Sequence, residues 1–484
     1  MLSLPFRSAK ELVSAIRRKK IGCLELLNLY LSRIDRYNPK INAVIFMKID
    51  EARKRARLAD RALAKGALWG PLHGLPITVK ESYDAVGMPT TWGVPAHRNY
   101  FPKKNALVVD RLLGAGAVLF GKTNVPLYLA DWQSFNEIYG TTNNPWDISL
   151  IPGGSSGGSA AALAAGLTGL EAGSDIGASI RNPAHYCGVF GHKPTYGIVS
   201  PRGQALPGTV SASDISAVGP LARSADDLAT ALAVMAGPDE IDGRGWQLRL
   251  PKPAQKSLRE FKVSIVYTDP EAEVDEEVQG RLRALADFLA KKRVQVKENA
   301  RPEINSHEAH KNYLQLLRSA TSGRLTPEEF RKSAEAAEAL DPADDSYQAR
   351  AFRAQAMPHW SWLAANEARH RMRLFWADFF REYDLLLCPI ATTAAFPHNQ
   401  KGERWERMVT VNGRPQPSTT QMFWAGYSCN FYLPSTVAPA GFTREGLPVG
   451  VQIVGPQYGD LTCIQFAKLL EEEFQGFIPP PGYE

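Results

Sequence analysis

Two short segments combine glycine and serine at a density that suits chemistry on a small ligand. The first, residues 152–165, reads PGGSSGGSAAALAA. Glycine tolerates positive φ angles and lets the backbone approach a ligand closely. Because the alanines that follow favour a helix, the N–H groups at its start should point back toward the serines.

The second segment, residues 173–184, reads GSDIGASIRNPA. Its turn at 176–179 leads into residues 181–184, which are suited to open another helix. Successive free amides in such a turn can form an oxyanion hole, which stabilises negative charge developing on an oxygen. The alternative is that both segments only connect elements, which would require Asp175 and Arg181 to lie beside them by chance.

Two other motifs overlap these regions. Residues 153–157 also match GxSxG, the turn that carries the nucleophile of α/β-hydrolases and would make Ser155 that nucleophile. Such a turn follows a strand, whereas residues 147–152 are brief and end in proline. Residues 116–123 match the pattern GxxxxGK[ST], but the intervening residues are apolar and strand-like, so we reject a phosphate-binding loop.

Histidines and cysteines offer no convincing catalytic set. Three histidines near these segments are more typical of hydrogen-bonded structural residues: His73, His185 and His192. A nitrilase-like set of Cys187, Glu81 and Lys80 is disfavoured, because adjacent strand residues face opposite sides. The five cysteines are dispersed without CxxC spacing, so we expect neither a disulfide framework nor a zinc site.

The bulk composition limits the classes of protein and partner. With 44% apolar and 22% charged residues in 484, the chain can build a large core. The net charge of +6 is spread along the chain, and clusters such as 17–20 lie beside helical patterns, so we expect no nucleic-acid partner. We see no apolar run long enough to span a membrane and no secretory signal, which predicts a cytoplasmic protein.

Strand-like and helical patterns alternate along the chain. Ser8 and Glu11 form a capping box before the first helical pattern. Helical patterns cover residues 10–16, 24–37, 53–65, 226–235 and 275–291, and short apolar runs suited to buried strands cover 76–79, 118–120, 263–267, 384–388 and 449–454. This alternation predicts an α/β fold with one large mixed β-sheet covered by helices on both faces. Residues of about 300–380 form a more variable, helical region.

The two glycine–serine segments resemble the amidase signature family. The likeness extends to residues 73–80 (HGLPITVK), 121–126 (GKTNVP) and 446–452 (GLPVGVQ), so it covers most of the chain. The resemblance implies the amidase-signature fold, a single domain over residues 1–484. It also implies a hydrolase that uses a serine, a second serine after a cis peptide bond, and a lysine, with no cofactor or metal.

Carried over by position, the resemblance makes Ser179 the nucleophile, Ser155 the bridging serine and Lys80 the base. It assigns the oxyanion hole to four backbone amides: Ile176, Gly177, Ala178 and Ser179. It further implies three supporting residues: Ser156, Asp175 and Arg181. A serine hydroxyl needs a neighbour that takes its proton, and lysine can do so only when neutral. Burial in a strand-like run would lower the pKa of Lys80 in this way.

Two residues depart from the family pattern. Alanine stands at 178 where the family usually has glycine, so the turn must tolerate one Cβ, and we expect an effect on specificity. Glu171 replaces a small residue close to the centre, and the sequence offers no account of it.

By resemblance, the substrate pocket lies after the 121–126 motif and in C-terminal segments. Those segments offer mainly aromatic side chains: Tyr128, Trp132, Ile138, Tyr139, Met422, Phe423, Trp424 and Tyr427. Such residues favour an apolar or aryl acyl group, although a structural role fits them equally well.

The leading hypothesis is an amidase that hydrolyses the C–N bond of small carboxamides through a Ser179 acyl-enzyme. Esters, anilides and carbamates share this chemistry and stay open. The alternative is the A subunit of a tRNA-dependent amidotransferase, which shares the same motifs and works in a complex. For a free-standing enzyme the partner is a small-molecule amide, and a homodimer is possible.

Overall fold

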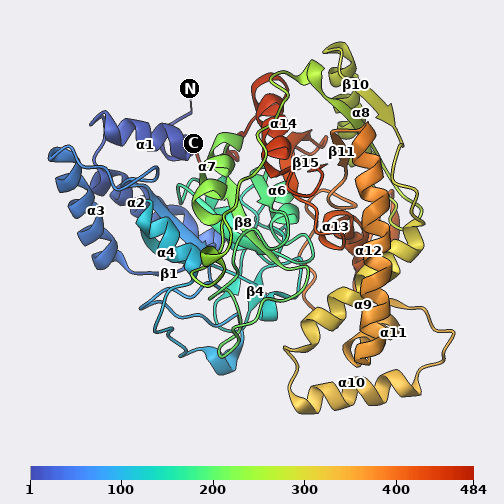
Figure 1. The fold of residues 1–484 in the computed structure, drawn as a ribbon. Helices are drawn as coiled ribbons and strands as arrows, with labels where there is room; N and C mark the ends of the chain where they lie inside the picture. The colour runs from blue at the N-terminus through green and yellow to red at the C-terminus, as the bar shows by residue number, and fades with distance from the viewer. Residues whose placement is uncertain (1) are drawn as a thin grey trace.

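A mixed sheet of eight strands forms the centre of the computed structural model, which describes residues 2–484 (Figure 1). In spatial order the strands are β10 (Gln295–Glu298), β9 (Lys262–Ile265), β11 (Leu385–Cys388), β15 (Pro448–Val454), β14 (Ser435–Phe442), β7 (Phe190–Lys193), β8 (Ala217–Ala222) and β6 (Glu171–Asp175). β9 runs parallel to both β10 and β11, and the other neighbours are antiparallel. The predicted large mixed sheet is confirmed.

Smaller sheets accompany the large one. β1 (Val44–Met47), β3 (Val118–Thr123) and β2 (Pro76–Lys80) form a three-stranded sheet, in that order. The strands predicted at 76–79 and 118–120 therefore lie outside the large sheet, because each pairs within this smaller one. Two hairpins complete the strands: β4 (Phe135–Asn136) with β5 (Gly140–Thr141), and β12 (Met408–Val411) with β13 (Arg414–Pro417).

Helices cover the large sheet on both faces. Successive strand residues point to opposite faces, and every residue of β6, β7, β8 and β15 is buried, so neither face is open to solvent there. The helices are α1 (Ala9–Arg17), α2 (Cys23–Ile41), α3 (Ile49–Ala64), α4 (Leu107–Gly114), α5 (Gly157–Ala164), α6 (Arg181–Cys187), α7 (Ala225–Met235), α8 (Glu276–Lys291), α9 (Ser306–Ser322), α10 (Pro327–Ala339), α11 (Tyr347–Gln355), α12 (His359–Glu382), α13 (Met422–Cys429) and α14 (Asp460–Glu473).

The local sequence explains where α1 begins. The predicted capping box is present at the start of α1, where the Glu11 amide donates to the Ser8 hydroxyl and the Glu11 carboxylate accepts from the Ser8 amide.

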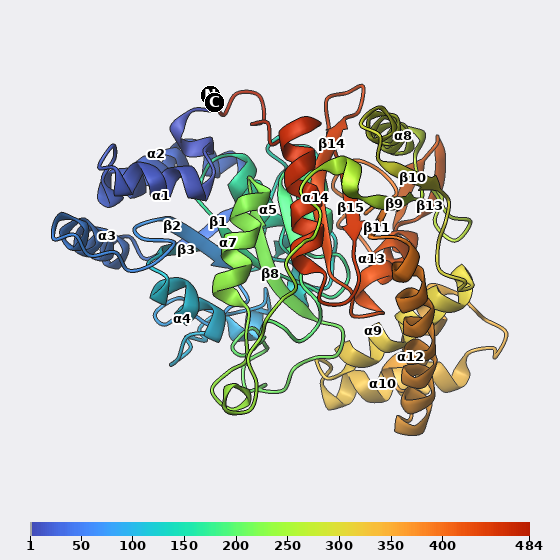
Figure 2. The ribbon, with the colours of Figure 1, turned by 45° about the horizontal axis from the view of Figure 1, so that its top comes forward.

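α7 and α14 lie side by side in front of the sheet in Figure 2. α9–α12 gather at the end of the molecule opposite α1–α3 in both views (Figures 1 and 2). Of the helices in residues 2–484, none has both the length and the apolar character needed to cross a membrane.

Candidate active site

Lys80 is the last residue of β2 and is fully buried. Its Nζ lies 2.6 Å from Ser155 Oγ and 3.0 Å from Ser174 Oγ. Burial disfavours the ammonium form and holds the pKa of Lys80 well below its usual value. The negative charge of Asp175 opposes this effect, and the positive charge of Arg324 adds to it. The structure thus brings together the predicted base and the predicted bridging serine.

Ser155 and Ser179 lie on two loops that touch. The Ser156 amide donates to the Ser179 carbonyl oxygen at 3.1 Å. The peptide bond between Gly154 and Ser155 is cis, as the family resemblance implied. Glycine is required at 154, because a Cβ there would lie 2.5 Å from the carbonyl oxygen of Asp131. Within residues 2–484, no hydrogen bond joins the two serine hydroxyls.

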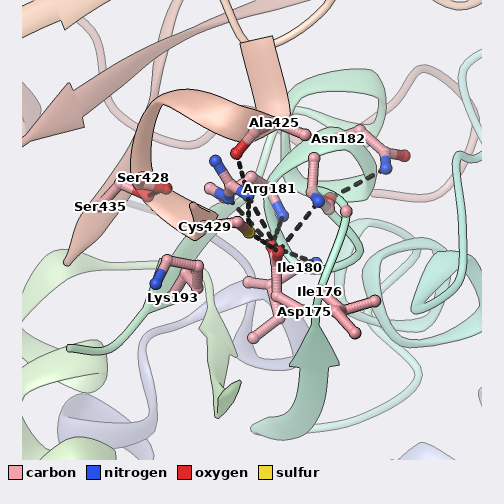
Figure 3. Close-up of polar contacts among 12 residues, drawn as sticks. Asp175, Ile176, Ile180, Arg181, Asn182, Lys193, Ala425, Ser428, Cys429 and Ser435 are labelled. Carbon is pink, nitrogen blue, oxygen red and sulfur yellow. Dashed lines mark hydrogen bonds and ion pairs between the residues drawn. The ribbon is translucent and has the colours of Figure 1, made fainter. Parts of the chain in front are cut away.

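Asp175 organises the turn that carries Ser179 (Figure 3). One carboxylate oxygen, Oδ1, accepts the Ala178 amide at 2.9 Å, and the other, Oδ2, accepts the Ile180 amide at 3.0 Å. These bonds hold Ala178 at φ +68°, a left-handed conformation that an alanine adopts only at some cost. The expectation that this turn tolerates one Cβ is met in this way.

The same hydrogen bonds reduce the number of backbone amides that can form the predicted oxyanion hole. Because the Ala178 amide is directed to Asp175, it is not free to face a ligand, which corrects the prediction for that residue. Among the described residues, the amides of Ile176, Gly177 and Ser179 have no hydrogen-bond partner, and these three residues line a cavity. Three amides, not four, are therefore available to an oxyanion.

Arg181 pairs with Asp175 in a fully buried ion pair at 2.9 Å. Its guanidinium also contacts Gln452, the Ala425 carbonyl oxygen and Cys429 Sγ. Burial alone would raise the pKa of Asp175, but the charge and hydrogen bonds of Arg181 outweigh it and lower that pKa to about 2. Asp175 is therefore ionised at any physiological pH and keeps its role as an acceptor.

The sequence did not indicate two further residues near Lys80. Ser174 precedes Asp175 in the second glycine–serine segment, so its position was the only available signal. Its hydroxyl accepts from Lys80 and also from Gln204 Nε2, at 3.1 Å. Gln204 lies in a loop that carries no motif. The predicted supporting residue Ser156 is buried, and its hydroxyl lies 3.4 Å from the Ser174 carbonyl oxygen.

Glu171, which the sequence left unexplained, is a buried residue with hydroxyl partners. It begins β6, is 2% exposed, and its carboxyl group contacts the hydroxyls of Thr78 and Thr123. Burial raises its pKa to about 8, although the hydroxyl hydrogen bonds work against this shift. The departure from the family is thus a buried carboxyl group whose neutral form is favoured by burial.

Ser179 opens into a cavity of ≈ 240 Å³. Of the predicted pocket residues, Tyr128, Trp132 and Met422 line it, and Trp132 Nε1 donates to the Gly177 carbonyl oxygen at 2.8 Å. α9 and α11 supply much of the remaining wall, together with the loop before β12.

The other five predicted pocket residues lie elsewhere: Ile138, Tyr139, Phe423, Trp424 and Tyr427. The amides of Ile138 and Tyr139 both bond Asn136 Oδ1 in the β4–β5 hairpin, which folds this segment away from the cavity. On α13 a rotation of about 100° per residue places Met422 and Trp424 on different faces. Trp424 is fully buried and donates to a carbonyl oxygen of residue 272, whereas Tyr427 and Phe423 line a second, smaller cavity.

The cavity also contains residues that no sequence motif pointed to. Four arginines line it, from the end of α9, the turn after it and the loop before β12: Arg318, Arg324, Arg404 and Arg407. They belong to the helical region and to loops where the family resemblance is thin. Within residues 2–484, no group of three or more His, Cys, Asp or Glu side chains is placed to hold a metal ion.

The buried ion pair leads to a stability prediction. Replacing Asp175 with asparagine leaves the Arg181 charge buried and unpaired, so the free energy of unfolding should fall by about 3–5 kcal/mol. Urea denaturation measures this change. The control is Glu367→Gln, which breaks the exposed pair with Arg371 and should cost less than about 1 kcal/mol. Similar losses in the two variants would contradict the role given to the buried pair.

Comparison with known proteins agrees with this architecture. A family model described as amidase matches residues 25–464. The indoleacetamide hydrolase of Bradyrhizobium diazoefficiens is 33% identical over 96% of this chain and 86% of its own length. The A subunit of the glutamyl-tRNA(Gln) amidotransferase of Synechococcus sp. is 32% identical over 96% of this chain and 95% of its own length.

A solved structure described as an amidase superposes with a TM-score of 0.79 at 28% identity and covers 96% of this chain and 99% of that one. The match of the family model over most of the sequence, together with these relatives, confirms the resemblance noted from the glycine–serine segments. The chain therefore belongs to the amidase family of enzymes, which act on the carbon–nitrogen bonds of amides.

Proposed function

We propose that this protein hydrolyses carboxamides through an acyl-enzyme on Ser179. The observation that carries the proposal is a buried lysine with a lowered pKa, 2.6 Å from Ser155 and one loop away from Ser179. Neutral Lys80 accepts a proton from Ser155 while Ser155 accepts one from Ser179, whose oxygen attacks the amide carbonyl carbon.

The negative charge that develops on the carbonyl oxygen is stabilised by the free amides of Ile176, Gly177 and Ser179. Collapse of this intermediate requires a proton on the departing nitrogen, since an amine anion is a very poor leaving group. Ser155 hands over that proton and is resupplied by Lys80. Water then attacks the acyl-enzyme by the same route and releases the acid.

The cavity supports a substrate with an apolar or aryl portion next to the reacting carbonyl. Trp132 and Met422 lie beside the Ser179 turn, and the walls include Leu317 and Phe396. The relative from Bradyrhizobium diazoefficiens, named as an indoleacetamide hydrolase, is consistent with such an amide. We therefore extend to this chain the preference for an apolar acyl group.

Substitution of the three residues tests the mechanism. Ser179→Ala and Lys80→Ala should each lower kcat by at least about 10³-fold, and Ser155→Ala should be severely impaired, because the three groups act as a unit. The assay is release of p-nitroaniline from acyl p-nitroanilides, with Ser361→Ala as the matched serine control. A fluorophosphonate probe should label Ser179. Full activity of Lys80→Ala would rule out the lysine as base.

The lowered pKa of Lys80 predicts the pH dependence. Since only the neutral amine accepts a proton, kcat/KM should fall as the pH drops through the pKa of Lys80, and the midpoint should lie well below 10.5. Glu171, with a pKa of about 8, could produce a similar limb, so the profile is repeated with Glu171→Gln. The limb should persist in that variant. Its loss would assign the titration to Glu171 instead.

A second candidate function is the A subunit of a tRNA-dependent amidotransferase. It is favoured by the amidotransferase relative from Synechococcus sp., which is similar over nearly its full length. Such a protein passes ammonia to a partner rather than releasing it. Co-purification of a stoichiometric partner, together with weak amide hydrolysis by the isolated chain, would favour this function.

We also propose that the enzyme is cytoplasmic and forms a homodimer. All five cysteines are buried and free, which supports a reducing, cytoplasmic compartment. A homodimer is supported by the exposed face of α12, where Trp360 is 74% and Leu374 67% exposed. Sedimentation velocity distinguishes a dimer from a monomer.

A further inference from the structure

Three arginines line the Ser179 cavity from different parts of the chain. Arg318 lies on α9, Arg324 in the turn that follows it, and Arg404 in the loop before β12. Arg318 is 6% exposed, and the other two are half-buried. We call these three residues the arginine cluster.

Within residues 2–484, no carboxylate forms an ion pair with the arginine cluster, although the charges of Asp131 and Glu403 act on Arg404 from a distance. The positive charge of Arg404 lowers the pKa of both Arg318 and Arg324, in addition to the larger effect of burial. The carboxylates that line the same cavity are engaged elsewhere. Asp131 pairs with Arg407 at 2.6 Å, and Glu329 accepts the amide that precedes α10 at 2.7 Å.

The cluster also has unused hydrogen-bond donors. Each guanidinium carries five N–H groups, yet each makes a single hydrogen bond among the described residues. Arg324 donates to the Tyr128 carbonyl oxygen at 2.9 Å, Arg404 to a carbonyl oxygen of residue 130 at 2.7 Å, and Arg318 to the Tyr347 hydroxyl. Within the part of the chain that the structure describes, the Nε of Arg318 is buried without a hydrogen-bond partner.

Like charges that are gathered and desolvated without a counter-charge are unfavourable, and guanidinium groups stay protonated in proteins. The missing partner is therefore expected to be an anion that enters the cavity. Guanidinium forks match the planar carboxylate in particular, by paired N–H···O bonds. Because Ser179 lines the same cavity, the anion and the scissile amide can belong to one molecule.

We propose that the arginine cluster binds a carboxylate carried by the substrate, so that the enzyme cleaves amides whose far end is anionic. The inference rests on the proposed function and narrows it. Apolar walls near Ser179 hold the middle of the substrate, and the cluster holds its end. A wholly apolar acyl group bound in the cavity would leave the arginines without an anionic partner.

A matched pair of substrates tests the proposal. Adipic acid mono-p-nitroanilide and hexanoic acid p-nitroanilide have the same number of acyl carbons and differ by a terminal carboxylate in place of a methyl group. The carboxylate should raise kcat/KM by at least about tenfold, as expected for charge-assisted hydrogen bonds. Equal rates, or preference for the neutral anilide, would overturn the proposal.

Variants of the cluster show whether it causes that preference. Arg318→Gln and Arg404→Gln should each reduce the ratio of kcat/KM for the charged anilide to kcat/KM for the neutral anilide by about tenfold. Arg404 lies in a loop, so its variant remains informative if Arg318→Gln fails to fold. Arg318→Lys should retain part of the preference. The control is Arg353→Gln on α11, which removes a positive charge that bonds only backbone carbonyl oxygens, and should retain all of it.

Binding to the Ser179→Ala variant separates this inference from the proposed function. Calorimetry should detect adipic acid monoamide binding at least about tenfold tighter than hexanamide, with the difference lost in the double variant with Arg404→Gln. Such binding without turnover of any anilide by the wild-type protein would overturn the proposed function alone. Turnover of neutral anilides without such binding would overturn only the carboxylate site. Tighter binding of inorganic phosphate than of the monoamide would replace the carboxylate by a phosphate.

Discussion

The buried ion pair between Asp175 and Arg181 is the constraint on which the rest of the active site depends. The Asp175 carboxylate accepts two amides of the turn, and Arg181 fixes that carboxylate from the other side. The burial of these two charges away from water is tolerated because Asp175 and Arg181 each also have hydrogen-bond partners. By taking the Ala178 amide, the pair decides which of the remaining amides face the cavity.

Desolvation acts on three sets of charges in this protein with different results. The charges of Asp175 and Arg181 compensate each other, so both groups stay ionised. Among residues 2–484, no carboxylate forms an ion pair with Lys80, so burial favours its neutral form and makes it suited to act as a base. The arginine cluster cannot lose its protons easily, and its charge is left for a ligand. Similar burial thus leaves the Asp175–Arg181 pair ionised, favours neutral Lys80 and keeps positive charge on the arginine cluster.

Much of the fold and of the site centre could be predicted from local patterns. The capping box at Ser8 and the positions of the main helices follow from apolar periodicity and local hydrogen bonding, although α2 ends four residues later and α3 begins four residues earlier than predicted. The contact between Lys80 and Ser155 followed from the family resemblance. Strand partners did not follow, because an apolar run says nothing about which sheet it joins. β2 and β3 therefore appeared in the smaller sheet.

The residues that line the substrate cavity could not be predicted from local sequence patterns. On α13 a rotation of a few residues separates Met422, which faces the cavity, from Trp424, which is enclosed in the core. Aromatic composition alone could not distinguish them. Arg318 and Arg404 are distant in sequence and belong to no motif, and they act on each other only because α9 and the loop before β12 fold to the same cavity.

The sequence by itself determined the family, the reactive residue types and the glycines that the tight loops require, since these depend on side-chain chemistry and local backbone freedom. Only the tertiary structure decided which amides are free, which side chains line the cavity and where charge is left unpaired. Those properties arise from burial and from contacts between distant segments, and neither is encoded in any single stretch of the chain.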